Sequence, residues 1–106
     1  MCDEKVMPKG TDALVVALCA DYFRRKRLIE HRTASHTVIM ECRYLNYRIL
    51  DAAASVVGTG YAERFIRDIG ECEGYGRGED IYMSETVYKI RKGEVKRAIA
   101  KRLSLF

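Results

Sequence analysis

The chain has 106 residues, of which 48% are hydrophobic and 32% charged, and its formal net charge is +4. This composition excludes a disordered or low-complexity chain, and the length suits one domain. No apolar run approaches the ~18 residues that span a bilayer, and the polar N-terminus does not read as a signal peptide. We therefore expect a cytoplasmic protein with a flexible leader over residues 1–10 and a single domain over residues 11–106.

Periodic apolar residues predict a first helix over residues 12–30. Thr11 can cap this helix, and Asp12 would lie in its first turn, where a carboxylate is favourable. The stripe that repeats at helical spacing consists of Val15, Leu18, Cys19, Tyr22, the stem of Lys26, and Ile29.

A second, longer helix is predicted over residues 35–57, with Ser35 or Thr33 as its N-cap and Gly58 just past its end. Its apolar stripe is Val38, Cys42, Leu45, Ile49, Ala53 and Val56. Tyr44, Tyr47 and Arg48 fall on the outer side of this helix. They either contact a partner or are half-buried in a helix–helix contact, which is the commoner case.

The third predicted helix is short: it opens at Thr59-Gly60 and ends at Gly70. A glycine-rich connection over residues 70–80 follows, and Ser84 then caps a last helix that contains Gly93. Four helices with short connections and no alternating strand pattern predict an all-α domain. We expect one core, formed by Leu18, Tyr22, Leu45, Ile49, Phe65, Ile69, Val95 and Ile99.

The charges are segregated along the chain. Residues 84–106 contain seven Lys or Arg and two Glu, whereas residues 61–80 contain three Arg and six Asp or Glu. A further basic cluster lies at residues 24–27. A basic last helix is either a solvated surface, a face that contacts phosphate groups, or a face that contacts an acidic protein partner.

The segment from Ser84 to Lys92, a serine cap followed by Glu, Thr, Val, Tyr and a run of basic residues, has the form of a recognition helix. With the helix that precedes it, residues 60–106 resemble the sigma-region-4-like helix-turn-helix regulators of phages and mobile elements in Gram-positive bacteria. The resemblance implies a small transcriptional regulator that binds double-stranded DNA. About 13 residues separate the two helices, more than the three or four of a tight helix-turn-helix, so a wing or a short extra helix is expected between them.

Under this hypothesis Val87 and Tyr88 hold the last helix on its scaffold, and a homodimer raises the affinity by engaging two half-sites. The residues expected to contact DNA are Ser84 at the cap, Glu85, Thr86 and Lys89 at base edges, and Lys92, Lys96, Arg24 and Arg25 at phosphates.

The alternative function is a protein-interaction module of a mobile element, such as an inhibitor of a host defence nuclease. The acidic segment over residues 71–80 would then imitate phosphates. An enzyme is the least favoured class, because neither histidine lies beside a nucleophile in a recognised motif. His31, His36 and Cys42 are of the types that bind zinc, but their spacing completes no site, and the four cysteines form no C-x-x-C pair, so no metal or other cofactor is expected.

Overall fold

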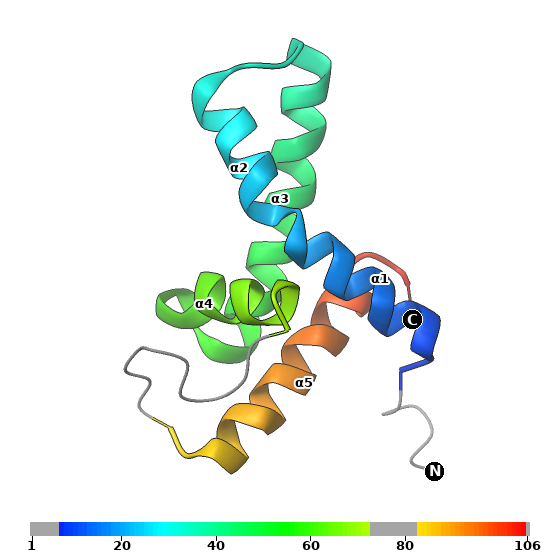
Figure 1. Ribbon diagram of the computed structural model, residues 1–106, viewed down its shortest axis with the longest axis vertical. Helices are drawn as coiled ribbons and strands as arrows, with labels where there is room; N and C mark the ends of the chain where they lie inside the picture. Colours follow the sequence, from blue (N-terminus) through cyan, green and yellow to red (C-terminus); the bar gives the residue numbers. More distant parts are fainter. Residues whose placement is uncertain (1–6, 73–82, 106) are drawn as a thin grey trace.

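The computed structural model describes residues 7–72 and 83–105, and these residues contain helices and no strand (Figure 1). The helices are α1 (Lys9–Ala20), α2 (Tyr22–His31), α3 (His36–Val57), α4 (Thr59–Gly70) and α5 (Glu85–Arg102). Because only Asp21 separates α1 from α2, these two helices form one bent helical segment, and the described residues therefore form four helical segments. The predicted all-α fold is confirmed.

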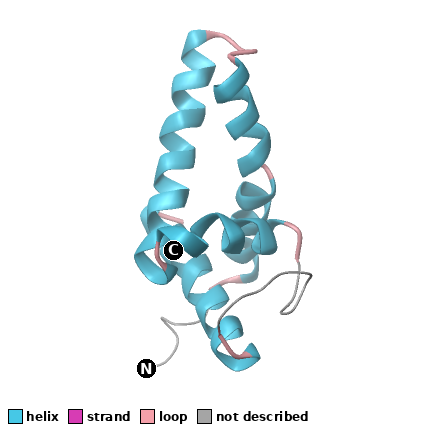
Figure 2. Cartoon of the chain, turned by 90° about the vertical axis from the view of Figure 1, so that its left-hand side faces the viewer, coloured by secondary structure: helices cyan, strands magenta, loops and turns pink. Residues whose placement is uncertain are grey.

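The molecule divides into an arm and a base, seen from two sides in Figures 1 and 2. The arm consists of α2, the turn after it, and residues 36–48 of α3, which run antiparallel to α2. The base consists of α1, α4, α5 and residues 49–57 of α3. The long α3 therefore joins the two parts, and the whole measures 43 × 34 × 20 Å.

The hydrophobic core lies mainly in the base, where α1, α3, α4 and α5 bring their apolar faces together. Six of the eight predicted core residues are buried, and Leu18 and Leu45 pack against the cluster while only partly buried. The predicted stripe of α3 was one residue out at its start: Val38 is exposed and Ile39 is buried instead. Val38 lies in the first turn, where α2 covers the neighbouring face.

Local capping signals in the sequence were read correctly at three helix ends. The hydroxyls of Ser35 and Ser84 accept hydrogen bonds from the backbone N–H groups of Val38 and Val87, at 3.3 and 3.2 Å. Gly58 follows α3 with a φ of 84°, a conformation that favours glycine. Such signals act over three or four residues and need no tertiary context.

The N-terminal prediction needs two corrections. First, α1 begins at Lys9, so the helix takes in the end of the predicted leader; residues 1–6 lie outside the described part. Second, Thr11 is not a cap, because Pro8 holds that position and the Thr11 hydroxyl donates instead to the carbonyl of Leu105, at 3.2 Å.

The single helix predicted over residues 12–30 is bent at Asp21, and the buried Arg25 accounts for the bend. Its guanidinium donates to the carbonyl of Leu18 in α1 (2.8 Å), to Asn46 Oδ1 in α3 (2.6 Å) and to the carboxylate of Asp21 (3.0 Å). The Asn46 amide in turn donates to the carbonyl of Tyr22, at 3.0 Å. A side chain that donates a hydrogen bond to a backbone carbonyl within the helical ladder in this way is an established cause of kinks.

Arg25→Ala is expected to lower the free energy of unfolding by about 2–4 kcal/mol, because the buried amide of Asn46 loses its donor. Arg24→Ala is the matched control: Arg24 pairs with Asp21 at the surface, and its loss should leave stability nearly unchanged. Urea unfolding of both variants measures the difference. Equal effects of the two changes would contradict a structural role for Arg25.

Gly70 ends α4 where that helix meets the backbone of α1. A Cβ atom built on Gly70 would lie 2.6 Å from the backbone nitrogen of Ala20 and 2.7 Å from its Cα. The sequence indicated Gly70 as a helix stop, and the structure adds that only glycine allows α4 and α1 to approach this closely.

Gly70→Ala should therefore destabilise the fold by about 1–3 kcal/mol, since backbone must move to admit the methyl group. Gly60→Ala is the control in the same helix, where a Cβ meets nothing within 4 Å. That variant should be neutral or more stable by up to about 1 kcal/mol, because alanine is the better helix former. Thermal unfolding of the two variants compares them, and a harmless Gly70→Ala would refute the close approach.

Candidate nucleic-acid interface

The N-terminal half of α5 forms the end of the base that lies opposite the arm (Figures 1 and 2). Ser84 caps this half, so its first turn starts in a defined place. Most of its side chains are exposed, and the large apolar Val87 and Ile90 are 39% and 52% accessible. The sequence-based expectation that Val87 would hold the helix on its scaffold was wrong.

Tyr88 is the anchor of this half of α5. Its ring is buried and lies against Phe65 of α4, with centroids 5.1 Å apart, and its hydroxyl donates to the carboxylate of Asp68 at 2.5 Å. Asp68 is itself buried, and its carboxylate also forms ion pairs with Arg64 and Arg67, whose Nε atoms lie 3.3 and 3.7 Å from it. The predicted role of Tyr88 is confirmed, and α4 supports α5 through it.

The face of α5 turned away from this anchor carries residues at helical spacing. Thr86 and Ile90 are exposed on this face, Glu85 and Lys89 are exposed on its flank, and Lys92 lies beside the Tyr88 ring with its Nζ 6.0 Å from the centroid. The structure thus brings five of the predicted contact residues onto one helix half: Ser84, Glu85, Thr86, Lys89 and Lys92.

Several cations of α5 are paired with acids at the surface. Lys89 lies 3.2 Å from Glu85, Arg91 lies 2.7 Å from Glu94, and Arg102 pairs with Asp51 of α3. The pair between Lys89 and Glu85 is largely exposed, so water and salt screen it and a phosphate can replace the carboxylate at little cost.

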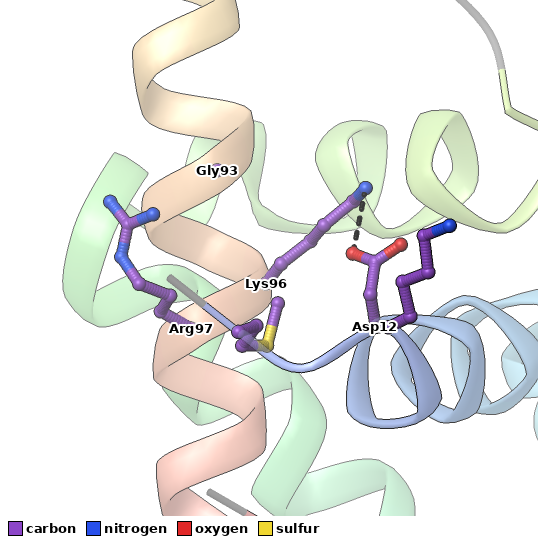
Figure 3. Close-up of a pocket in the computed structure, with 6 residues that line it drawn as sticks. Asp12, Gly93, Lys96 and Arg97 are labelled. Atoms are coloured by element: carbon purple, nitrogen blue, oxygen red, sulfur yellow. Dashed lines mark ion pairs between the residues drawn. The ribbon is translucent and has the colours of Figure 1, made fainter. Parts of the chain in front are cut away.

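Lys96 belongs to a shallow basic pocket between α5 and the start of α1 (Figure 3). The pocket has a volume of about 370 Å³ and is lined by Met7, Lys9, Asp12, Gly93, Lys96 and Arg97. Lys96 reaches across to Asp12, at 3.2 Å, whereas Arg97 extends away from it. Three cations against one carboxylate leave this pocket positively charged.

Gly93 lies in the wall of that pocket, in the middle of α5, and the helix passes through it without a break. The nearest neighbour of a Cβ built there would be the Arg97 guanidinium at 3.6 Å, an ordinary contact. Glycine inside a helix costs about 1 kcal/mol relative to alanine. Packing among the described residues does not require glycine at this position, so its effect is to leave the backbone uncovered in the wall of the pocket.

The two arginines of α2 that were predicted to contact phosphates do not join this face. Arg25 is buried, and its guanidinium is committed to Asn46, Leu18 and Asp21. Arg24 is exposed and is held by both carboxylate oxygens of Asp21, which lowers the pKa of that carboxyl. It lies on α2, in the arm, away from the N-terminal half of α5 (Figure 1).

The histidines and cysteines that the structure describes do not form a cluster. His31 and His36 are exposed on the two sides of the arm's turn, while Cys42 and Cys19 are buried, as the apolar stripes predicted. Burial raises the pKa of the Cys19 thiol to about 12. Within residues 7–72 and 83–105, no three His, Cys, Asp or Glu side chains lie close enough to hold a metal ion.

Sequence reasoning missed Asp68, Lys9 and Gly93 as parts of this region. The sequence shows Asp68 as one of the acidic residues over 61–80, although its spacing from Arg64 is the i,i+4 spacing of a helical ion pair. Lys9 falls within the leader that the sequence predicts over residues 1–10. The expected wing or extra helix, and nearly all of the acidic segment over 71–80, fall outside the described residues.

Comparison of the chain with protein-family models, with curated proteins and with solved structures found no match. Among the described residues, no helix is both long and apolar enough to cross a membrane.

The hydrogen bond from Tyr88 to Asp68 can be tested by Tyr88→Phe, which keeps the ring and removes the hydroxyl. We expect the free energy of unfolding to fall by about 1.5–3 kcal/mol, the range for a hydrogen bond to a charged group. Urea unfolding followed by circular dichroism measures it. An unchanged midpoint would show that the ring alone anchors α5.

Proposed function

We propose that this protein binds double-stranded DNA through the N-terminal half of α5, as a small transcriptional regulator. The observation that carries the proposal is the division of that helix: Tyr88 is buried against α4, while the opposite face presents exposed side chains suited to a DNA groove. A helix anchored from behind and exposed in front is what reading of the major groove requires.

The chemistry of the exposed face fits this role. Lys89 can donate to guanine O6 and N7, the Thr86 hydroxyl can donate to a base acceptor or accept from a base amino group, and the apolar Ile90 can contact a thymine methyl group. Glu85 can accept from a cytosine amino group, and it also restrains Lys89 in the free protein. The basic pocket that includes Lys9, Lys96 and Arg97 then lies one to two turns further along α5, where a backbone phosphate can enter.

Phage or mobile-element origin and a homodimeric state are part of the same proposal and rest on the resemblance of residues 60–106 to sigma-region-4-like regulators. A dimer fits, because a single short helix binds DNA weakly and a second half-site multiplies the affinity.

The test is fluorescence anisotropy of a labelled random-sequence duplex, titrated with the full chain at several salt concentrations. If about five phosphates are neutralised, log K should fall with log salt at a slope of about −4 to −5. Lys92→Ala with Lys96→Ala should reduce the magnitude of that slope by about 2, since each lost phosphate contact removes about 0.9.

Arg27→Ala with Arg43→Ala is the matched control, because it removes the same charge from exposed positions on the arm. This control should leave the slope unchanged. The absence of salt-sensitive binding by the wild-type chain at micromolar concentration would overturn the proposal. Equal losses in the two double variants would show that net charge, and not the α5 face, attracts the DNA.

A further inference from the structure

The outer face of α3 carries an uncovered stripe of large side chains. Met40, Tyr44 and Tyr47 are 48%, 64% and 65% exposed, and their spacing of four and then three residues places them in one row. The row lies opposite Cys42 and Asn46, which face α2. The same four-three spacing forms the seam of a coiled coil.

Tyr44 in this stripe is held in position from within the chain. The Arg48 guanidinium lies 5.3 Å from the centroid of the Tyr44 ring and donates to its hydroxyl at 3.0 Å. Arg48 also donates to the backbone carbonyl of Arg102 at the end of α5. An aromatic side chain that is both exposed and restrained loses little entropy when a partner covers it.

We infer that a second copy of this chain covers the stripe, with the two α3 helices antiparallel and a two-fold axis passing between Leu45 and Asn46. In this register Tyr44 meets the partner's Tyr47, and symmetry repeats the contact. In an antiparallel pair, residues on the same flank of the seam lie next to each other across the interface. Glu41 and Arg48 share such a flank, because each directly follows a seam residue, Met40 or Tyr47. Glu41 therefore lies beside the partner's Arg48, also twice.

Charge selects this arrangement over its rivals. The carboxylate of Glu41 is exposed and has no acidic or basic partner among the described residues, so it is available to a second chain. A parallel pair of α3 helices would instead set Arg43 beside the partner's Arg48, which is repulsive on both flanks of the seam. A nucleic acid on the stripe would meet the carboxylates of Glu41 and Asp51. The stripe is thus complementary to itself in the antiparallel sense.

This inference supplies the interface of the homodimer in the proposed function, and it can be tested apart from DNA binding, which uses the opposite end of the molecule. The first test is sedimentation velocity of the full chain from micromolar to several hundred micromolar. We expect a concentration-dependent dimer, and we expect Tyr44→Ala with Tyr47→Ala to abolish it. A wild-type chain that stays monomeric throughout would overturn the inference.

The register itself is tested by two charge reversals. Glu41→Arg alone and Arg48→Glu alone each create two repulsive pairs, so each variant should dimerise about tenfold more weakly or worse. When the two variants are mixed, both pairs become attractive again, and a heterodimer should form. Glu30→Arg, which makes the same charge change on α2, is the control and should dimerise like the wild type. Failure of the mixture to associate would refute this register, and a weakened control would refute the assignment to α3.

Discussion

The buried guanidinium of Arg25 is the interaction on which the shape of this protein depends. It binds a carbonyl of α1, a carboxylate at the bend and an amide of α3, so it fixes three segments relative to one another. Burial lowers the pKa of Arg25, which shows the cost of desolvating the charge, and the carboxylate of Asp21 offsets part of it. Such buried charges are weak sources of stability, and their effect here is to select one arrangement of the helices.

The bend produced by Arg25 separates the arm from the base. Without it, residues 9–31 would continue as one straight helix and α2 would not run antiparallel to α3. A second tie holds the start of α2 to the base: the hydroxyl of Tyr22 and the Nζ of Lys26 both donate to the carboxylate of Glu63 in α4, at 2.9 and 2.8 Å. Burial of Glu63 opposes its ionisation, but these two donors outweigh it and lower the pKa of the carboxyl. The arm is therefore positioned by polar contacts, whereas the base is held by apolar packing.

The parts of this structure that could be predicted from the sequence are those with a local cause. Ser35, Gly58 and Ser84 act within one turn, and the core stripes follow from the helical period. Arg25 could not be predicted, because four consecutive basic residues give no sign of which one is buried; its partner Asn46 is 21 positions away. The exposure of Val87 likewise could not be predicted, because it depends on how α4 positions α5. Tyr88, by contrast, was predicted as an anchor from the apolar spacing. Gly70 was identified as a helix end, but its close approach to Ala20 is a tertiary fact.

The two proposals place constraints on each other through the length of α3. In an antiparallel pair centred between Leu45 and Asn46, Ser55 of one copy lies opposite His36 of the other. The two Ser55 positions are then 19 residues apart along the helix axis, or about 28 Å at 1.5 Å per residue. The N-terminal half of α5 lies at the end of the base away from the arm, so the two copies of it are further apart than that (Figures 1 and 2). A dimer of this kind cannot bring both α5 helices into one groove segment, and its half-sites must be separated by at least one turn of the duplex, about 34 Å.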